Sequence, residues 1–304
     1  MYQSNLYEYL SALDTRNPAL LISKNDKASQ SIFAVATFLG FDAFVLPDLR
    51  VSYGEDLRSY QEELHEILDT LSRYYRSLAP KKLLIAPLRT LLLKLPKEQY
   101  LHHAIIEFGQ KIVLGEFKER LYSWGYLLVD IATARGEVSF RGDIIDIFPI
   151  NSETPYRISL FDDEVESIRS FDVSSQKSVV DELEAITVIP AFLDLGFAEL
   201  QALMSRIERA NFDLFVNDIY SVGFWVLDEL AMDYTLHFNA ILSENMDEEL
   251  EEIYALDTPM VPRSSFNLAT LAPAKKFRDI EAVQLNKICL LYTSDAADEE
   301  DSVD

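Results

Sequence analysis

Cysteine is nearly absent from this sequence of 304 residues, since Cys289 is the only one. One cysteine excludes an internal disulfide and a cysteine-based zinc site. No apolar run approaches the roughly 20 residues that a membrane-spanning helix needs, and the first residues lack the apolar core of a signal peptide. We therefore expect a protein of the reducing cytoplasm with no membrane contact.

Basic residues are also scarce. The chain has 27 Lys and Arg against 51 Asp and Glu, which gives a formal net charge of −24. This charge argues against nonspecific binding of nucleic acid by the whole chain, because phosphate contacts need clustered Lys and Arg. Any DNA contact would need a local basic patch. The hydrophobic content of 49% is enough for two domains with buried cores.

The first third of the chain alternates apolar strands with helical patterns. Short apolar runs that end in polar residues or proline predict strands at 19–22, 44–46 and 83–86. Apolar residues at helical spacing predict helices over 28–39 and from about 55 to 78. Strands separated by helices imply a parallel sheet with crossover helices, so this part predicts an α/β domain.

Glycine is missing where a phosphate loop would need it. In helicase-like α/β domains this loop follows the first strand, and that position holds SKNDKASQ, residues 23–30. The loop G-x-x-x-x-G-K-[ST] needs glycines for the approach of backbone amides to phosphate, and a Lys for the β and γ oxygens. Lys24 and Lys27 are present, but both glycines are missing and no Gly-Lys pair occurs anywhere. We expect a P-loop NTPase-type scaffold without its P-loop, and no cofactor.

The densest pattern runs from residue 125 to 172. Residues 138–148 and 157–161 are rich in β-branched and aromatic side chains, with polar residues interleaved and glycine or proline at each break. This is typical of short antiparallel strands and predicts a β-meander. Because side chains alternate along a strand, Arg157 and Phe161 are expected on one face, opposite the apolar Ile158.

Motifs in this stretch resemble a known family. The sequence contains G-Y-x-x-V-D, then R-G-E-x-x-x-R-G-x-I-x-D-I-F-P, then P-Y-R-x-x-x-F-D-D-E-x-x-x-I-R-x-F-D. This order is similar to the signature of the transcription-repair coupling factor (Mfd) and its paralogue UvrB, and the spacing holds across several turns. In both families the block opens the small β domain that docks on UvrA, the damage sensor of bacterial nucleotide excision repair. The resemblance is dense over 125–172 and thinner outward, to about 1–288.

The resemblance implies a division of the chain. Residues 1–113 would be the first part of a degenerate, helicase-like, UvrB-like α/β domain, and 114–190 an inserted, mostly antiparallel β domain for UvrA interaction. Residues 191–288 would return to complete the α/β domain. Independently of the resemblance, apolar patterns predict short strands at 186–189 and 214–216 and a helix over 224–232. Residues 289–304 form an acidic tail with a disordered composition. Its phrase CLLYTSDAADE also resembles translated sequencing-adaptor read-through, in which case Cys289 onward is not natural sequence.

The family's UvrA-contacting positions match Arg141, Arg157 and Phe161. Arg can hold a carboxylate with two parallel hydrogen bonds, and an exposed Phe offers an apolar anchor. Taken from the residues alone, Phe161 could instead be core, and both arginines could pair with the carboxylates of 162–164. Asp143 stands where coupling factors often have a small residue, so it could hold the Arg141 guanidinium or partly neutralise it.

No catalytic site and no metal site is expected. The adjacent His102 and His103 would point to opposite faces of a strand and could not chelate one metal. The acidic run 247–252 lacks the alternating ligands and the glycine of a calcium loop. The sequence has no G-x-S-x-G motif and no catalytic cysteine signature.

Two functions of different classes follow. The first is a non-enzymatic module that recruits UvrA in bacterial transcription-coupled nucleotide excision repair, with no small-molecule substrate. The family's RNA-polymerase-binding domain and ATP-driven DNA translocase, which would supply the contacts to polymerase and DNA, are not in this sequence. The alternative is a divergent UvrB-type damage-recognition DNA helicase fragment. It would need an ATP loop and a tyrosine-rich hairpin. The pair Tyr74-Tyr75 resembles such a hairpin only superficially, because both residues belong to the apolar stripe of a predicted helix.

Overall fold

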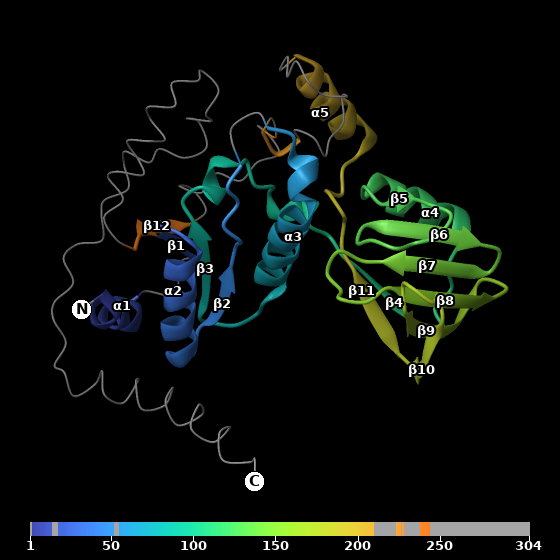
Figure 1. Cartoon of the computed structure of the whole chain (residues 1–304), viewed down its shortest axis with the longest axis horizontal. Coiled ribbons are helices and arrows are strands. Elements are labelled where there is room, and N and C mark those ends of the chain that lie inside the picture. The colour runs from blue at the N-terminus through green and yellow to red at the C-terminus, as the bar shows by residue number, and fades with distance from the viewer. Residues whose placement is uncertain are drawn as a thin grey trace, which may run out of the picture.

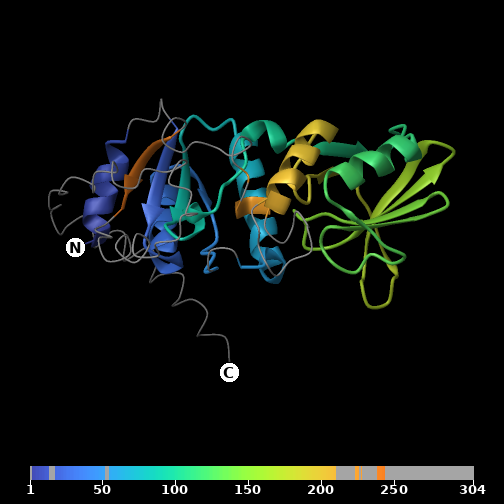
Figure 2. The same cartoon turned by 90° about the horizontal axis from the view of Figure 1, so that it is seen from above.

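The computed structural model describes residues 2–13, 18–51, 55–209, 223–225, 227 and 238–243. In these ranges the chain forms a four-stranded parallel sheet, a six-stranded mostly antiparallel sheet and a two-stranded ribbon. Figures 1 and 2 show the two larger sheets side by side along the molecule, with the helix α3 between them.

The parallel sheet has the order β12-β1-β3-β2. Its strands are β1 (Ala19–Ser23), β2 (Asp42–Val45), β3 (Lys82–Pro87) and β12 (Asn239–Leu242). β1 is buried along its whole length, as expected of a parallel strand that is covered on both faces. The three strands predicted near the start of the chain are confirmed. β12 pairs with β1, so the chain comes back to this sheet after forming the antiparallel one.

Helices cover both faces of the parallel sheet (Figure 1). On one face, α1 (Tyr2–Ser11) and α2 (Asp26–Phe38) share a buried cluster with Leu21 and Ile85. On the other, α3 (Gln61–Arg76) packs against Leu20 through an apolar stripe, as its sequence predicts. A 3₁₀ turn η1 (Leu57–Tyr60) precedes α3. The other 3₁₀ turns are η2 (Thr90–Leu92), η3 (Glu98–Tyr100) and η4 (Gly223–Trp225), and a further helix is α5 (Phe197–Arg209).

A two-stranded ribbon joins the two sheets. β4 (Ala104–Glu107) leads the chain toward the antiparallel sheet, and β11 (Ala185–Val188) leads it away. The two strands pair antiparallel from Ala104 with Val188 to Glu107 with Ala185. The sequence did not predict the first of these strands, although it placed a strand at 186–189. The ribbon lies between the larger units (Figure 1).

The six-stranded sheet has the order β10-β9-β8-β7-β6-β5. It consists of β5 (Leu127–Leu128), β6 (Glu137–Arg141), β7 (Ile144–Phe148), β8 (Tyr156–Phe161), β9 (Glu164–Phe171) and β10 (Ser178–Glu182). Neighbouring strands are antiparallel except for β5 and β6, which confirms the predicted meander. α4 (Leu114–Ser123) lies on one face of this sheet. Its Lys118 Nζ is 5.7 Å from the ring centroid of Phe140.

Several sequence expectations fall outside the described residues. They are a strand at 214–216, the acidic run 247–252 and the tail 289–304. Of a helix expected over 224–232, the structure describes the turn η4 and Leu227. In the part of the chain that is described, no helix is long and apolar enough to cross a bilayer.

Candidate partner-binding surface

Arg141, Arg157 and Phe161 lie on one face of the antiparallel sheet. Arg141 is the last residue of β6, and the other two belong to β8. Side chains alternate along β8, so Ile158 and Leu160 turn to the opposite face, where both are buried. The face that carries the three predicted residues is the one away from this core.

Two hairpin turns bring Arg141 and Phe161 to the same end of the sheet. The turn after Arg141 contains Gly142 with φ of +61°, a left-handed conformation that suits glycine. The turn after Phe161 contains Asp162 with φ of +57°, which aspartate tolerates better than most residues. Ile144 pairs with Ser159, so both turns lie at one end, and β6 and β8 stand two strand spacings, roughly 10 Å, apart.

Phe161 is exposed. Its relative exposure is 70%, although its neighbour Leu160 is 5% exposed. The alternative that Phe161 belongs to the core is therefore wrong. An apolar ring held at the surface by a rigid strand is a suitable anchor for a partner's apolar pocket.

The two arginines meet on one carboxylate. Asp146 of β7 is fully buried, and it accepts hydrogen bonds from Arg157 Nε to Oδ1 at 2.7 Å and from Arg157 Nη2 to Oδ2 at 2.9 Å. Arg141 Nη2 also donates to Asp146 Oδ2. The hydrogen bonds that Arg157 donates to Asp146 raise the pKa of the Arg157 guanidinium. The alternative pairing of both arginines with the carboxylates of 162–164 is wrong.

Arg157 has further contacts inside the protein. Its Nη1 donates to the carbonyl oxygen of Gln176 at 3.1 Å and to Ser178 Oγ at 3.4 Å. Its guanidinium carbon lies 4.9 Å from the ring centroid of Phe171. The Arg157 side chain is 19% exposed, against 46% for Arg141. The two arginines thus present very different amounts of surface to a partner.

Asp146 links the two arginines, and the sequence analysis did not single it out. It is an acidic residue between the buried Ile145 and Ile147 in a strand that is buried after its first residue, and a carboxylate in such a place needs hydrogen-bond donors. That signal was available in the sequence. Of the two roles expected for Asp143, holding the Arg141 guanidinium is corrected, because the carboxylate that Arg141 contacts is Asp146. Partial neutralisation of Arg141 by the exposed Asp143 stays a prediction.

Charge is divided across this face. Beyond Arg157, β9 places Arg169 directly opposite it, and Arg169 pairs with Glu182 of β10. At the turn after Phe161 the carboxylates of 162–164 are exposed, and Lys111 Nζ lies 3.5 Å from Asp163 Oδ1. The turn after Phe161 is therefore acidic, whereas at the turn after Arg141 one exposed cation, Arg141, stands near one exposed carboxylate, Asp143.

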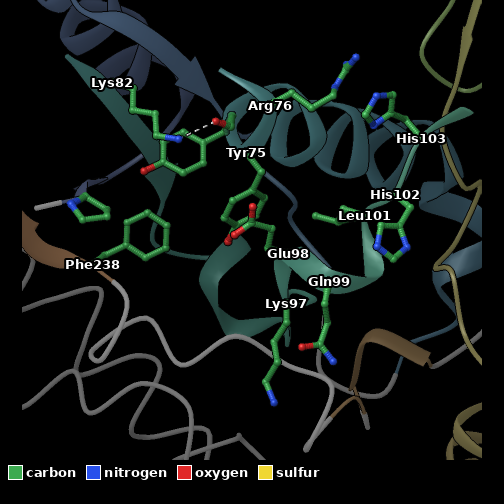
Figure 3. Close-up of a pocket in the computed structure, with 12 residues that line it drawn as sticks. Tyr75, Arg76, Lys82, Lys97, Glu98, Gln99, Leu101, His102, His103 and Phe238 are labelled. Atoms are coloured by element: carbon green, nitrogen blue, oxygen red, sulfur yellow. Dashed lines mark hydrogen bonds between the residues drawn. The ribbon is translucent and has the colours of Figure 1, made fainter. Parts of the chain in front are cut away.

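A pocket with a volume of about 690 Å³ lies on the parallel-sheet unit, away from this face (Figure 3). Two of the basic side chains that line it, Lys82 and His102, bond within the protein. Lys82 Nζ donates to the carbonyl oxygens of Tyr74 and Ser77 at 3.1 and 3.3 Å and lies 4.5 Å from the Tyr74 ring centroid. His102 Nδ1 is 2.8 Å from Asp194 Oδ2. This pocket shows no pairing of a nucleophile with a base among its described residues.

A smaller pocket of about 390 Å³ lies at the start of α2 and the end of β2. Three carboxylates line it, from Asp26, Asp48 and Glu66, together with Arg50, whose Nε donates to Asp48 Oδ2 at 2.9 Å. The side-chain oxygen of Asn25 accepts from Ala28 N at 3.0 Å, so it occupies a backbone donor at the start of α2. Within the described ranges, no group of three or more His, Cys, Asp or Glu could hold a metal ion.

Residues 105–193 match the family model described as the UvrB interaction domain. The antiparallel sheet and its ribbon therefore form a domain of the UvrB-interaction class. The chain is 34% identical over 286 residues to the transcription-repair-coupling factor of Helicobacter pylori (strain ATCC 700392 / 26695), covering 92% of this chain and 28% of that protein. It belongs to the transcription-repair-coupling factor family.

Other relatives match shorter parts of the chain. The transcription-repair-coupling factor of Bacillus subtilis (strain 168) is 35% identical over 184 residues, covering 59% of this chain and 15% of that protein. That of Escherichia coli (strain K12) is 38% identical over 134 residues, covering 43% of this chain and 11% of that protein. The chain thus spans under a third of the length of these relatives.

Proposed function

We propose that this chain is a UvrA-docking module of a transcription-repair coupling factor, acting in bacterial transcription-coupled nucleotide excision repair in the cytoplasm. One observation carries the proposal: Phe161, 70% exposed, stands at the same end of the sheet as Arg141 on a UvrB interaction domain. An exposed aromatic ring near a guanidinium combines two residue types that are enriched among interface hot spots.

The contacts of Arg141 support a role at the surface. One of its nitrogens donates to Asp146, while nearly half of its side chain remains exposed. A guanidinium has five N–H donors, so Arg141 can hold Asp146 and a partner's carboxylate at the same time. Phe161 supplies the apolar contact. Arg157 is the third of the matched residues, and it bonds to the same Asp146 carboxylate as Arg141.

The domain division is part of the proposal. Residues 1–113 and 191–288 would form one degenerate helicase-like α/β domain, with 114–190 inserted. The pairing of β12 with β1 and the antiparallel ribbon of β4 with β11 support an insertion, because both connections to the antiparallel sheet run side by side. Contacts to DNA and RNA polymerase would belong to other parts of such a protein.

We infer that the module has no catalytic activity of its own. The loop after β1 lacks the glycines of a phosphate loop, and the carboxylates of Asp26, Asp48 and Glu66 line the pocket beside it. Negative charge there would repel a triphosphate, whereas nucleotide-binding folds place free backbone amides at that helix N-terminus. ATP-driven movement would need a motor domain elsewhere in the whole protein.

The alternative, a UvrB-type helicase fragment, has less support. It needs tyrosines that can enter DNA, but Tyr74 is 2% exposed on α3, and burial raises its pKa to about 12. Burial also raises the pKa of Tyr75. Tyrosines packed this way cannot separate strands or stack on bases without unfolding α3.

Isothermal titration of UvrA with the purified chain tests the proposal. We expect Phe161→Ala to weaken binding by about 2 kcal/mol or more, roughly thirtyfold in Kd. The matched control is Phe197→Ala, because Phe197 is 76% exposed but begins α5. The control should leave the affinity unchanged. Equal affinity of the Phe161 variant and the original chain would refute the proposed docking surface.

A further inference from the structure

We propose that Asp146 is a positioning residue, which holds the Arg141 guanidinium in place for a carboxylate of the partner, and that Arg157 acts on the partner through Asp146. This inference rests on the proposed function and deepens it. Of the three matched residues, Arg141 and Phe161 would touch the partner. Arg157 would instead hold Asp146 in position, and Asp146 would orient Arg141.

The hydrogen bonds of Arg157 give the first reason. Of its five N–H donors, Nε and one on Nη2 are directed to Asp146, and Nη1 serves Gln176 and Ser178. The Phe171 ring lies 4.9 Å from the guanidinium carbon. A guanidinium whose donors are largely used and whose side chain is 19% exposed has little left to offer a partner. Arg157 therefore fixes the position of the Asp146 carboxylate.

The bonding of Asp146 gives the second reason. The two bonds from Arg157 are parallel, with one nitrogen on each carboxylate oxygen, and this geometry fixes the plane of the carboxylate. Oδ2 also accepts from Arg141, so the orientation of the Arg141 side chain depends on that plane. A long side chain that is already ordered loses less conformational entropy when a partner binds.

The charge of the cluster identifies the chemistry of the partner group. Two guanidinium groups and one carboxylate leave one net positive charge, and the more exposed cation of the pair is Arg141. The turn at 162–164 is acidic and would repel an anion. The geometry therefore predicts a partner carboxylate at Arg141 and an apolar pocket for Phe161, roughly 10 Å away across two strands.

A double-mutant cycle on UvrA affinity tests this arrangement. We expect Asp146→Asn and Arg141→Ala each to weaken binding about tenfold or more, since each removes the ordered cation or its support. Because Asp146 acts through Arg141, the double variant should bind no more than about twofold more weakly than Arg141→Ala alone. Fold losses that multiply, or an Asp146→Asn variant that binds as the original chain does, would overturn the proposal.

A second variant keeps the test decisive if Asp146→Asn fails to fold, as loss of a buried charge partner can cause. Arg157→Lys keeps the cation, but an ammonium cannot bridge both carboxylate oxygens. It should weaken UvrA binding when Arg141 is present and have no further effect in Arg141→Ala. The same loss in both backgrounds would show that Arg157 touches the partner directly.

The outcomes separate this inference from the proposed function. If the original chain does not bind UvrA, the proposed function fails. If the chain binds and Phe161→Ala weakens binding, but the cycle is additive, only the positioning role of Asp146 fails. Urea unfolding of each variant provides the folding control, because a purely structural effect would lower stability without coupling to Arg141 in the affinity.

Discussion

His65 of α3 lies against Gly136, which precedes β6: a Cβ built on Gly136 would be 3.5 Å from His65 Cε1. Beside this contact, Arg135 Nη1 is 3.2 Å from Glu62 Oε2, also on α3. The helix that packs on the parallel sheet therefore also touches the antiparallel sheet unit. Both contacts lie on the face of α3 toward that unit, and they make the junction between the two sheets a place where substitutions should affect stability.

We expect the stability of the chain to fall as His65 becomes protonated. Burial, together with the charge of Arg135, lowers the pKa of His65 to about 4. The unfolded chain, with a pKa near 6.5, binds the proton more tightly, so this contribution is complete above about pH 6.5 and is lost as the pH falls toward 4. Between pH 7.5 and 5 the loss should be about 2 kcal/mol.

Urea unfolding at the two pH values measures this effect. His65→Leu removes the titrating group, so its stability should change less over the same range. A pH dependence that is identical in the original chain and in His65→Leu would contradict the assignment to His65.

Gly136→Ala should destabilise the fold by about 1–2 kcal/mol. Gly136 has φ of +83°, and the nearest atoms to an added Cβ are 3.5 Å or more away, so the cost comes from the backbone and not from a collision. The matched control is Gly115→Ala in α4, where a Cβ would meet nothing within 4 Å. That change should stabilise the helix by up to about 1 kcal/mol. Thermal unfolding of both variants distinguishes backbone strain from a general response to alanine.

Asn25→Ala should cost about 1 kcal/mol of stability, because it removes the side-chain acceptor for Ala28 N at the start of α2. Asn25→Ser keeps an acceptor at that position. Its free energy of unfolding should lie within about a few tenths of a kcal/mol of that of the original chain, because Ser and Asn are nearly equivalent N-cap residues. Denaturant unfolding measures both. Equal losses in the two variants would mean that Asn25 acts in some other way than as a cap.

A non-hydrolysable ATP analogue should not bind to the chain in a saturable way. The pocket beside α2 is lined by three carboxylates and one arginine, Arg50, which is paired with Asp48, and the remaining negative charge opposes a triphosphate. Calorimetric titration in the presence of Mg²⁺ checks this, with a functional P-loop ATPase as the positive control. Saturable binding by the original chain would favour the UvrB-type helicase fragment over the docking module.

Much of the architecture could be predicted from local patterns. The alternation along β8 placed Arg157 and Phe161 on one face, and the apolar runs located β1, β2 and β3. These features depend on side-chain period and on turn residues, which are local properties. The missing phosphate loop is equally local, since it is a matter of which residues follow β1.

Other features could not be predicted in this way. The strand β4 is short and half exposed, and it exists because β11, far along the chain, pairs with it. The place of β12 beside β1 likewise depends on a contact between distant segments. Such pairings carry no local periodicity, because the energy that selects them comes from hydrogen bonds and burial between distant residues.

The sequence by itself determined the family resemblance, the period of each strand and the face on which Arg157 and Phe161 lie. Only the tertiary structure decided that Arg141 and Arg157 share Asp146, and that the Phe161 side chain is exposed to solvent. The physical reason is register: a strand's pattern specifies which side chains share a face, whereas the pairing of β6, β7 and β8 decides which of those side chains can touch.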